Sequence, residues 1–380
     1  MSMSMSIKTL VIVLSETRAH ELTFNNFKKN VIDELNADLC VCIGVKPNYD
    51  YDNPFYKLAK YKFIYNETDD YGDGFEEAYN IISKNKPKYE CLNDKITNIN
   101  EILNNNKISY YNDINIEDIS EKYHNNNNNK DVIIIKKKLT EKELWKNVIY
   151  ENKKTFIYKK PIHWRNFLRL QYNIWGGVKN DYNYPGGSGG ILLFFRWFLL
   201  KKLIENNLIN EYDRFIITRS DFMYQLPHPK MEVMNKNNIW IPNAEYYGGF
   251  TDRHAVLSKT NIEEYLNIFN NFVLKSNEYF MKMKNYPGWN IEQLIKFNLK
   301  ENKLEHIVKE FPYIMYAVRN INGSVSAVGV EGDYDKKLGY FIKYKKEYQL
   351  STNYKNNYEK SAYNLNNFYL NEIIKINQDK

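Results

Sequence analysis

Apolar runs and a helical period alternate along the first 45 residues of the chain. Residues 10–14 form a continuous apolar run, which is typical of a strand buried on both faces of a parallel sheet. Residues 39–45 form a second run of this kind. Between the two runs, apolar side chains recur close to the helical period at Leu22, Phe27, Val31, Ile32 and Leu35. This order predicts a right-handed βαβ crossover, with ligands expected beyond the carboxyl ends of the strands.

The second half of the chain continues the same alternation. Its patterns predict strands over residues 214–218 and 238–242, and helices over residues 164–175, 191–206, 261–275, 290–302 and 365–376. A glycine-rich loop, residues 184–190, precedes the second of these helices. We therefore expect an α/β fold with a mostly parallel, twisted, Rossmann-like sheet flanked by helices.

The predicted domain organisation follows from where this pattern weakens. Periodicity is poor between residues 65 and 158, and a run of asparagines at 125–129 indicates an insertion or a variable region. We expect one α/β domain over residues 7–335 that contains this region. Residues 336–380 are rich in Tyr and Asn and are predicted to form a C-terminal extension that ends in a helix.

The composition narrows the class of protein. Hydrophobic residues make up 43% of the chain and charged residues 26%, which indicates a globular rather than a disordered or fibrous protein. The net charge of +7 is compatible with an anionic ligand. The lysines are scattered rather than gathered into a stripe, so we expect no binding of nucleic acid.

Two apolar segments are too short or too interrupted to act as membrane segments. Residues 10–14 are fewer than a signal peptide or a membrane span requires. Arg196 interrupts residues 191–200, which are better explained as a buried amphipathic helix.

The three cysteines, Cys40, Cys42 and Cys91, form neither a disulfide framework nor a metal-binding spacing. We expect a soluble, cytoplasmic protein without a transmembrane segment.

The clearest candidate for chemistry follows the strand predicted over residues 214–218. This strand delivers Arg219 and Asp221 to its carboxyl end, and their spacing of two directs both side chains to one side. A carboxylate in this place can hold Mg²⁺ or Mn²⁺ together with phosphate oxygens, and an arginine can bind those oxygens. The alternative is a surface ion pair that contributes little to stability.

The run from Tyr212 to Phe222, in which three hydrophobic residues precede an Arg-x-Asp, resembles GT-A type glycosyltransferases of bacteria and large DNA viruses. The resemblance implies transfer of a sugar from a nucleoside-diphosphate sugar to a glycan or protein acceptor, in the host cytoplasm if the chain is viral. It also implies that Asp221 binds Mn²⁺ or Mg²⁺ and, through it, the donor diphosphate. Arg219 stands where most such enzymes carry the first Asp of an Asp-x-Asp motif, and an arginine there can partly replace the cation.

The end of the first strand supplies three candidates for donor binding, Ser15, Thr17 and Arg18. The resemblance places the nucleotide base and ribose at this strand end, where Arg18 can meet a phosphate. An ordinary strand-to-helix connection explains the same residues equally well.

A second segment, residues 240–254, fits the same site. Gly248 and Gly249 permit close approach of the backbone to a ligand, and Asp252 follows within a dense polar triplet. By resemblance this segment forms the pocket for the donor sugar and the acceptor. A simple turn is the alternative.

Glu292 is the candidate general base, and Asp252 is its rival. The resemblance places an acidic residue near the acceptor hydroxyl at the start of the helix predicted over residues 290–302. A base there would deprotonate the acceptor. Glu292 is equally well explained as a first-turn carboxylate that the helix dipole favours.

Two further residues are candidates by position. Arg165, close to the glycine-rich loop, is predicted to contact the donor. His306 follows the last clear helix before the C-terminal region, and the resemblance implies a third metal ligand from a late histidine. A lone histidine without a ligand is the alternative.

Two other classes of function stay open at this point. A nucleotidyltransferase that makes the sugar nucleotide would share the nucleotide-binding half, but residues 15–18 lack the glycine-rich signature that we expect of it. A non-catalytic protein that binds glycans or serves a structural role is consistent with the missing first Asp. If Asp221 binds the metal, Asp221→Asn is expected to abolish transfer and leave the melting temperature nearly unchanged.

Overall fold

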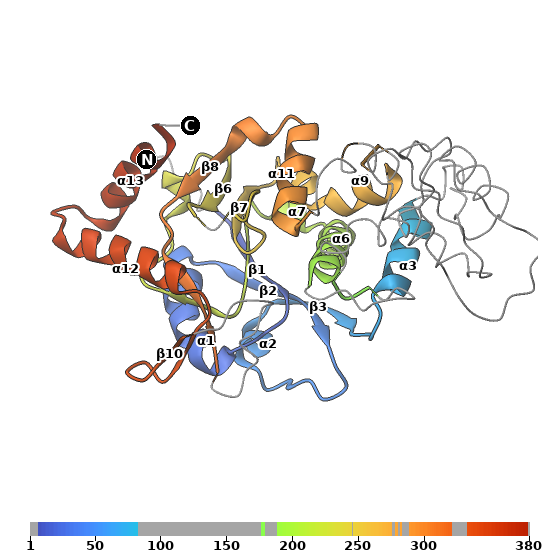
Figure 1. The fold of residues 1–380 in the computed structure, drawn as a ribbon, viewed down its shortest axis with the longest axis horizontal. Helices are drawn as coiled ribbons and strands as arrows, with labels where there is room; N and C mark the ends of the chain where they lie inside the picture. The colour runs from blue at the N-terminus through green and yellow to red at the C-terminus, as the bar shows by residue number, and fades with distance from the viewer. Residues whose placement is uncertain are drawn as a thin grey trace, which may run out of the picture.

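The computed structural model describes residues 7–82, 176–178, 188–244, 246–275, 278–279, 282, 289–320 and 333–378 (Figure 1). From position 83 onward, the region predicted to be variable lies outside the described residues. The helix predicted over residues 164–175, which carries Arg165, and most of the glycine-rich loop lie outside them too. Two sheets, one of seven strands and one of four, organise the described chain.

The seven-stranded sheet has the order β3-β2-β1-β4-β7-β6-β8. Four of its strands, β3, β2, β1 and β4, run parallel, β7 is antiparallel to both of its neighbours, and β8 is parallel to β6. The strand bounds are β1 Thr9–Ser15, β2 Asp38–Val45, β3 Tyr61–Asn66, β4 Arg214–Thr218, β6 Ile239–Pro242, β7 Ala255–Ser258 and β8 Val308–Phe311. The structure confirms the predicted α/β fold with a mostly parallel sheet flanked by helices.

Both faces of β1 are buried, as its unbroken apolar run predicts. Leu10, Ile12 and Leu14 belong to the core on one face, whereas Val11 and Val13 belong to the core on the other. Because successive side chains of a strand point to opposite faces, a strand between two helical layers has no polar position. β2 alternates in the same way and is buried along nearly its whole length.

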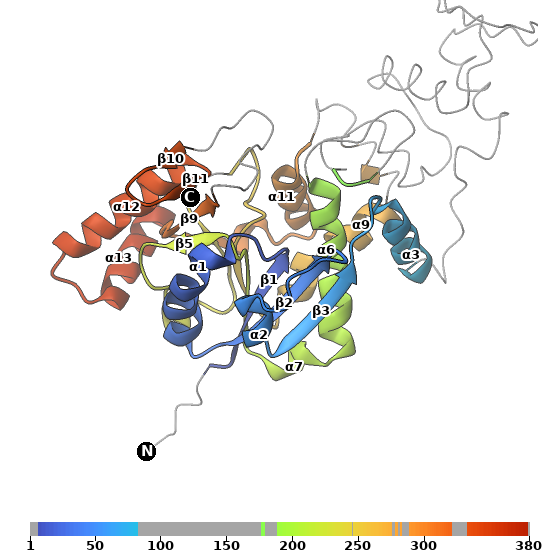
Figure 2. The same cartoon turned by 90° about the horizontal axis from the view of Figure 1, so that it is seen from below.

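Helices form a layer on each face of this sheet, and Figures 1 and 2 show the two layers from perpendicular directions. The first layer consists of α1 His20–Phe27, its π-helical continuation Lys28–Asp33, α2 Pro54–Leu58 and α13 Leu365–Gln378. The second consists of α3 Gly72–Ile82, α6 Gly189–Glu205, α8 Ile262–Leu266, α9 Ile268–Leu274 and α11 Ile291–Glu301. Short helical turns Leu208–Glu211, Met231–Val233 and Glu305–Ile307 connect other elements.

The predicted helices that fall on described residues agree with these elements, apart from two differences in their character, whereas α3 was not predicted. The helix expected over residues 261–275 is divided at Asn267 into α8 and α9. α6 is buried around most of its circumference rather than along one stripe, and even Arg196 is fully buried. The side chain of Arg196 donates from Nη2 to the carbonyl oxygen of Asp252 at 2.9 Å, which gives the buried guanidinium a polar partner.

The four-stranded sheet has the order β10-β11-β9-β5. Its strands are β5 Phe222–Tyr224, β9 Met315–Arg319, β10 Asp333–Asp335 and β11 Tyr340–Ile342, and α12 Lys345–Lys360 packs against β9. Only residues 219–221 separate β4 from β5, so the chain passes from one sheet to the other at the Arg-x-Asp motif. The C-terminal segment therefore completes the small sheet beside this motif.

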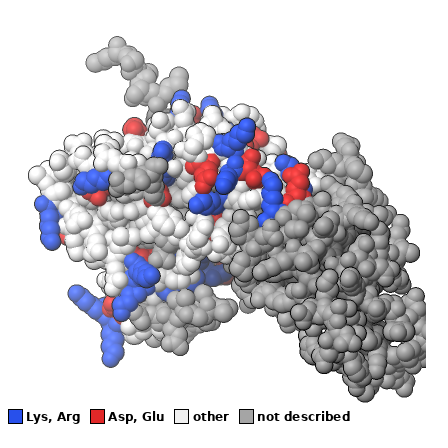
Figure 3. Space-filling view, turned by 45° about the horizontal axis from the view of Figure 1, so that its top comes forward, with Lys and Arg blue, Asp and Glu red and all other residues white. Residues whose placement is uncertain are grey.

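No helix in the part of the chain that the structure describes is both long enough and apolar enough to cross a membrane. On the face shown in Figure 3, basic and acidic side chains are interspersed.

Candidate functional site

A cavity of about 120 Å³ lies at the carboxyl ends of β1 and β4. These neighbouring parallel strands continue in opposite directions, β1 toward β2 and β4 toward the antiparallel half of the sheet. Ligands of open α/β sheets bind where the strand order reverses in this way. The polar lining comes from both strand ends and from more distant segments: Ser15, Glu16, Arg18, Glu67, Ser188, Thr218, Arg219, Ser220, Asp221, Asp252, Arg253 and Lys343.

The connection after β1 is held against the connection after β4. The Ser220 hydroxyl lies 3.1 Å from the carbonyl oxygen of Glu16 and 3.0 Å from that of Arg18. Ser15 has a left-handed backbone with φ of 76°, and its buried hydroxyl has no hydrogen-bond partner among the described residues. Strained backbone and an unpaired buried hydroxyl in one residue are typical of a ligand site.

Two of the three predicted donor residues at this strand end line the cavity, and the third does not. Arg18 lines it beside its ion-pair partner Glu16. Thr17 instead turns toward Tyr49 and Asn53, with its hydroxyl 2.8 Å from Tyr49 Oη. This hydroxyl therefore serves the packing of the loop after β2.

Asp221 lies almost completely buried between two arginines. Its Oδ1 accepts from Arg219 Nε at 2.8 Å, and its Oδ2 accepts from Arg219 Nη2 at 2.7 Å. Arg319, at the end of β9, donates to Oδ2 from Nη1. Burial opposes ionisation, but the charge and hydrogen bonds of Arg219, with the charge of Arg319, outweigh it and hold the pKa of Asp221 well below its usual range.

Lys343 adds a further positive charge to this cavity. It follows β11 and has no carboxylate within ion-pair distance among the described residues. Burial, and then the charges of Arg219 and Arg319, lower the pKa of Lys343 to about 7. Lys343 and Arg319 were not predicted from sequence, although Arg319 ends an apolar strand and Lys343 follows one.

A divalent cation does not fit this arrangement of donors. Asp221 has about four acceptor positions, and three of them are occupied by the two arginines. His306, predicted as a further metal ligand, lines a different cavity. Within the described part of the chain, no group of three or more His, Cys, Asp or Glu side chains is placed to hold a metal ion.

The two candidate bases, Asp252 and Glu292, lie within electrostatic reach of one another. Burial, and then the charge of Asp252, raise the pKa of Glu292 to about 7, while Arg253 and Arg196 oppose the increase. The amide of Phe250 donates to the Glu292 carbonyl oxygen at 3.0 Å, which joins the loop before Asp252 to the start of α11. A carboxyl group with a pKa near neutrality is suited to proton transfer.

Arg253 fixes the position of this loop. Its guanidinium pairs with the fully buried carboxylate of Glu347, at the start of α12, and lies 4.9 Å from the ring centre of Tyr344. Glu347 also accepts from the Ala317 amide at 3.1 Å. The start of α12 thus holds the segment that carries Asp252.

No protein-family model matches the chain, and no curated protein matches it with significant similarity.

Two buried histidines support Thr218, the last residue of β4. His228 Nδ1 lies 2.8 Å from the Pro229 carbonyl oxygen and must donate to it, so its Nε2 is an acceptor when the ring is neutral. His254 Nε2, at 3.3 Å, is then the donor, and His254 Nδ1 accepts from the Thr218 hydroxyl at 3.0 Å. Burial lowers the pKa of both rings, that of His228 to about 4, and keeps this chain of hydrogen bonds neutral.

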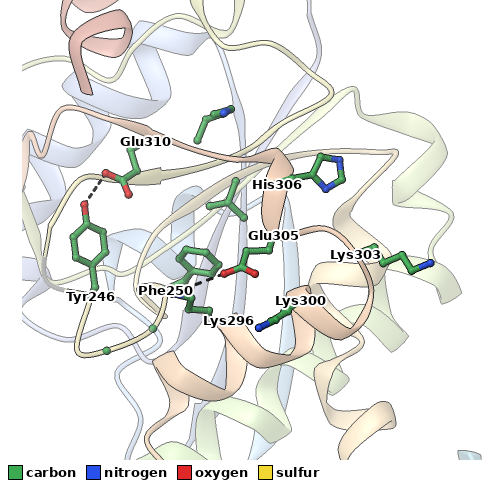
Figure 4. Close-up of a pocket in the computed structure, with 12 residues that line it drawn as sticks. Tyr246, Phe250, Lys296, Lys300, Lys303, Glu305, His306 and Glu310 are labelled. Carbon is green, nitrogen blue, oxygen red and sulfur yellow. Dashed lines mark hydrogen bonds and ion pairs between the residues drawn. The ribbon is translucent and has the colours of Figure 1, made fainter. Parts of the chain in front are cut away.

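The predicted residues Gly248, Gly249 and His306 line a second and larger cleft, of about 850 Å³. Figure 4 shows Tyr246 and Glu310 at one end of this cleft and His306 and Lys303 at the other. Four lysines line it, Lys296, Lys300, Lys303 and Lys309. The loop that carries Gly248 and Asp252 therefore contributes to both cavities, and the structure separates His306 from Asp221.

Proposed function

We propose that the chain is a GT-A type glycosyltransferase that takes its sugar from a nucleoside-diphosphate donor. The proposal rests on one observation: a crevice at the β1–β4 switch point is lined by basic side chains and by Asp252, with Glu292 outside the lining but within electrostatic reach of Asp252. Sugar transfer needs both features, because an anionic diphosphate leaves as an acceptor hydroxyl loses its proton.

The reaction that we propose is a displacement at the anomeric carbon. The acceptor oxygen forms a bond to that carbon while the bond to the donor diphosphate breaks. The bonding electrons leave with the diphosphate, whose negative charge Arg219 and Lys343 would stabilise. The hydroxyl proton passes to Glu292, or to Asp252 in its place, as general base.

The residues of the strand ends would orient the donor. Ser15 offers its unpaired hydroxyl, and Arg18 offers a guanidinium that is half exposed. The loop at Gly248 and Gly249, between the crevice and the larger cleft, would face the acceptor. A hydroxyl of a glycan or of a protein is the acceptor class that fits this proposal. Mn²⁺ or Mg²⁺, the cofactors implied by the resemblance, do not fit the donors described above, and no step of this proposal depends on them.

A panel of sugar nucleotides tests the proposal. Uridine, guanosine and thymidine diphosphate sugars are titrated by calorimetry, and bound donors are then assayed for hydrolysis and transfer. We expect at least one donor to bind and to be turned over. Absence of binding by every nucleotide would contradict the proposal, and binding without turnover on any acceptor would favour a non-catalytic glycan-binding or structural protein.

A further inference from the structure

The cavity lining as a whole is balanced in charge, with Arg18, Arg219, Arg253 and Lys343 matched in number by Glu16, Glu67, Asp221 and Asp252, but basic side chains dominate immediately around Asp221. Arg219, Arg319 and Lys343 come from three separate segments and surround one buried carboxylate. Lys343 is partly buried and has no carboxylate partner among the described residues. Buried like charges repel one another strongly, so such a cluster is most stable when an anion joins it.

The hydrogen bonds at Asp221 determine which donors remain for a ligand. Arg219 uses Nε and Nη2 to bind the carboxylate, which fixes the plane of its guanidinium and leaves the donors of Nη1 available. Its side chain is 22% exposed and lines the cavity. Arg319 is only 5% exposed and binds both Asp221 and the Val318 carbonyl oxygen, so it stays behind the carboxylate. Asp221 is thus positioned to orient guanidinium groups.

Other donors face the same small space. Ser15 contributes a buried hydroxyl with no partner among the described residues, and Lys343 contributes an ammonium group. A guanidinium, an ammonium and a hydroxyl together match the oxygens of a phosphate group. A cation at the same point would meet Arg219 and Lys343, and the other carboxylates of the lining, Glu16, Glu67 and Asp252, each have a basic partner.

We propose that Arg219 and Lys343 form a subsite that binds the donor diphosphate without a divalent cation. Asp221 and Arg319 are positioning residues in this subsite, because Asp221 holds Arg219 and uses three of its acceptor positions for the two arginines, while Arg319 holds Asp221 from behind the cavity. The inference rests on the proposed function for the identity of the anion. It differs from the resemblance in giving Asp221 no metal to bind.

Calorimetric titration of the full chain with uridine, guanosine and thymidine diphosphates tests this, in excess EDTA and again with Mn²⁺. We expect at least one nucleoside diphosphate to bind with about the same affinity in both conditions. Lys343→Met should weaken that binding about tenfold or more, as loss of a charge-assisted contact does. Lys309→Met, in the other cleft, is the matched control and should leave it unchanged.

Arg219→Lys supplies a second readout. The lysine keeps the positive charge but cannot donate two parallel hydrogen bonds to the carboxylate, so Asp221 should gain a free acceptor. Mn²⁺ should then strengthen nucleotide binding by this variant, although it has no effect on the wild type. Binding by the wild type only in Mn²⁺ would overturn the inference and leave the proposed function intact. Binding in EDTA that Lys343→Met does not change would overturn the subsite. No binding in either condition would overturn the proposed function and the inference with it.

Discussion

Asp221 and Arg319 are 98 residues apart in the chain and form an ion pair that is almost closed to solvent. The pair joins the carboxyl end of β4 to the end of β9 and so connects the large sheet to the small one. Arg219 shares the same carboxylate from the cavity side. The motif of Arg219 and Asp221 therefore lines the cavity and also joins the two sheets.

Asp221→Asn is expected to lower the stability of the fold. Removing one partner of a buried ion pair leaves uncompensated charge, here on two arginines, and typically costs about 3–5 kcal/mol. This burial contradicts the expectation from sequence that the melting temperature would be nearly unchanged. The free energy of unfolding from urea titration measures the effect, with Asp52→Asn as a control, because Asp52 pairs with Lys57 in solvent. Equal stability of the two variants would contradict the prediction.

Glu292→Gln is expected to reduce turnover about 10²–10⁴-fold, as loss of a general base does. Because the pKa of Glu292 is raised to about 7, wild-type activity should rise as the pH increases through 7, where the carboxylate forms. That limb of the pH profile should disappear in the variant. Glu264→Gln, an exposed carboxyl group at the start of α8, is the matched control. If the limb persists, Asp252→Asn becomes the variant that identifies the base.

Stability should depend on pH through two groups that act in opposite directions. The pKa of His228 is about 4 in the fold and near 6.5 when unfolded, so stability is lost as the pH falls through that interval, by about 3 kcal/mol. The pKa of Glu292 is raised from 4.5 to about 7, so its contribution is lost as the pH rises. Glu292→Gln should therefore show a steeper increase of unfolding free energy between pH 4.5 and 6.5 than the wild type. Identical slopes would show that these two groups do not titrate in this way.

Gly249→Ala is expected to disturb the connection between the loop and α11. An added Cβ would lie 2.0 Å from the Glu292 carbonyl oxygen, so the backbone at the start of the helix must move. Overpacking of this kind costs about 1–3 kcal/mol, and here it would also displace the candidate base. Gly339→Ala is the control: its added Cβ meets nothing within 4 Å, and only its φ of 78° opposes the change. Thermal unfolding of both variants, with turnover of the first, measures the difference, and a fully active Gly249→Ala variant would contradict the assigned role of this contact.

The amino-acid sequence by itself determined the local elements and the class of fold. The buried strands at residues 10–14, 39–45 and 214–218 agree with β1, β2 and β4, because the interior of a strand covered on both faces is apolar, and in β4 only the end residues Arg214 and Thr218 are polar. α11 agrees with its prediction, and its start is set locally by a capping box between Asn290 and Gln293. The strands β3, β7 and β8, the whole small sheet, and the helices α3 and α12 were not predicted. Most of these strands have only three to five residues, which carry little periodicity.

Only the tertiary structure decided which side chains meet at the site. The motif of Arg219 and Asp221 was visible in the sequence, but the partners Arg319 and Lys343 come from strands about 100 or more residues away. The tertiary structure also places His306 in a different cavity from Asp221 and brings Glu292 within electrostatic reach of Asp252. Hydrophobic periodicity is a local signal, whereas the pairing of charges at a sheet edge depends on strand order and register, which no local pattern records.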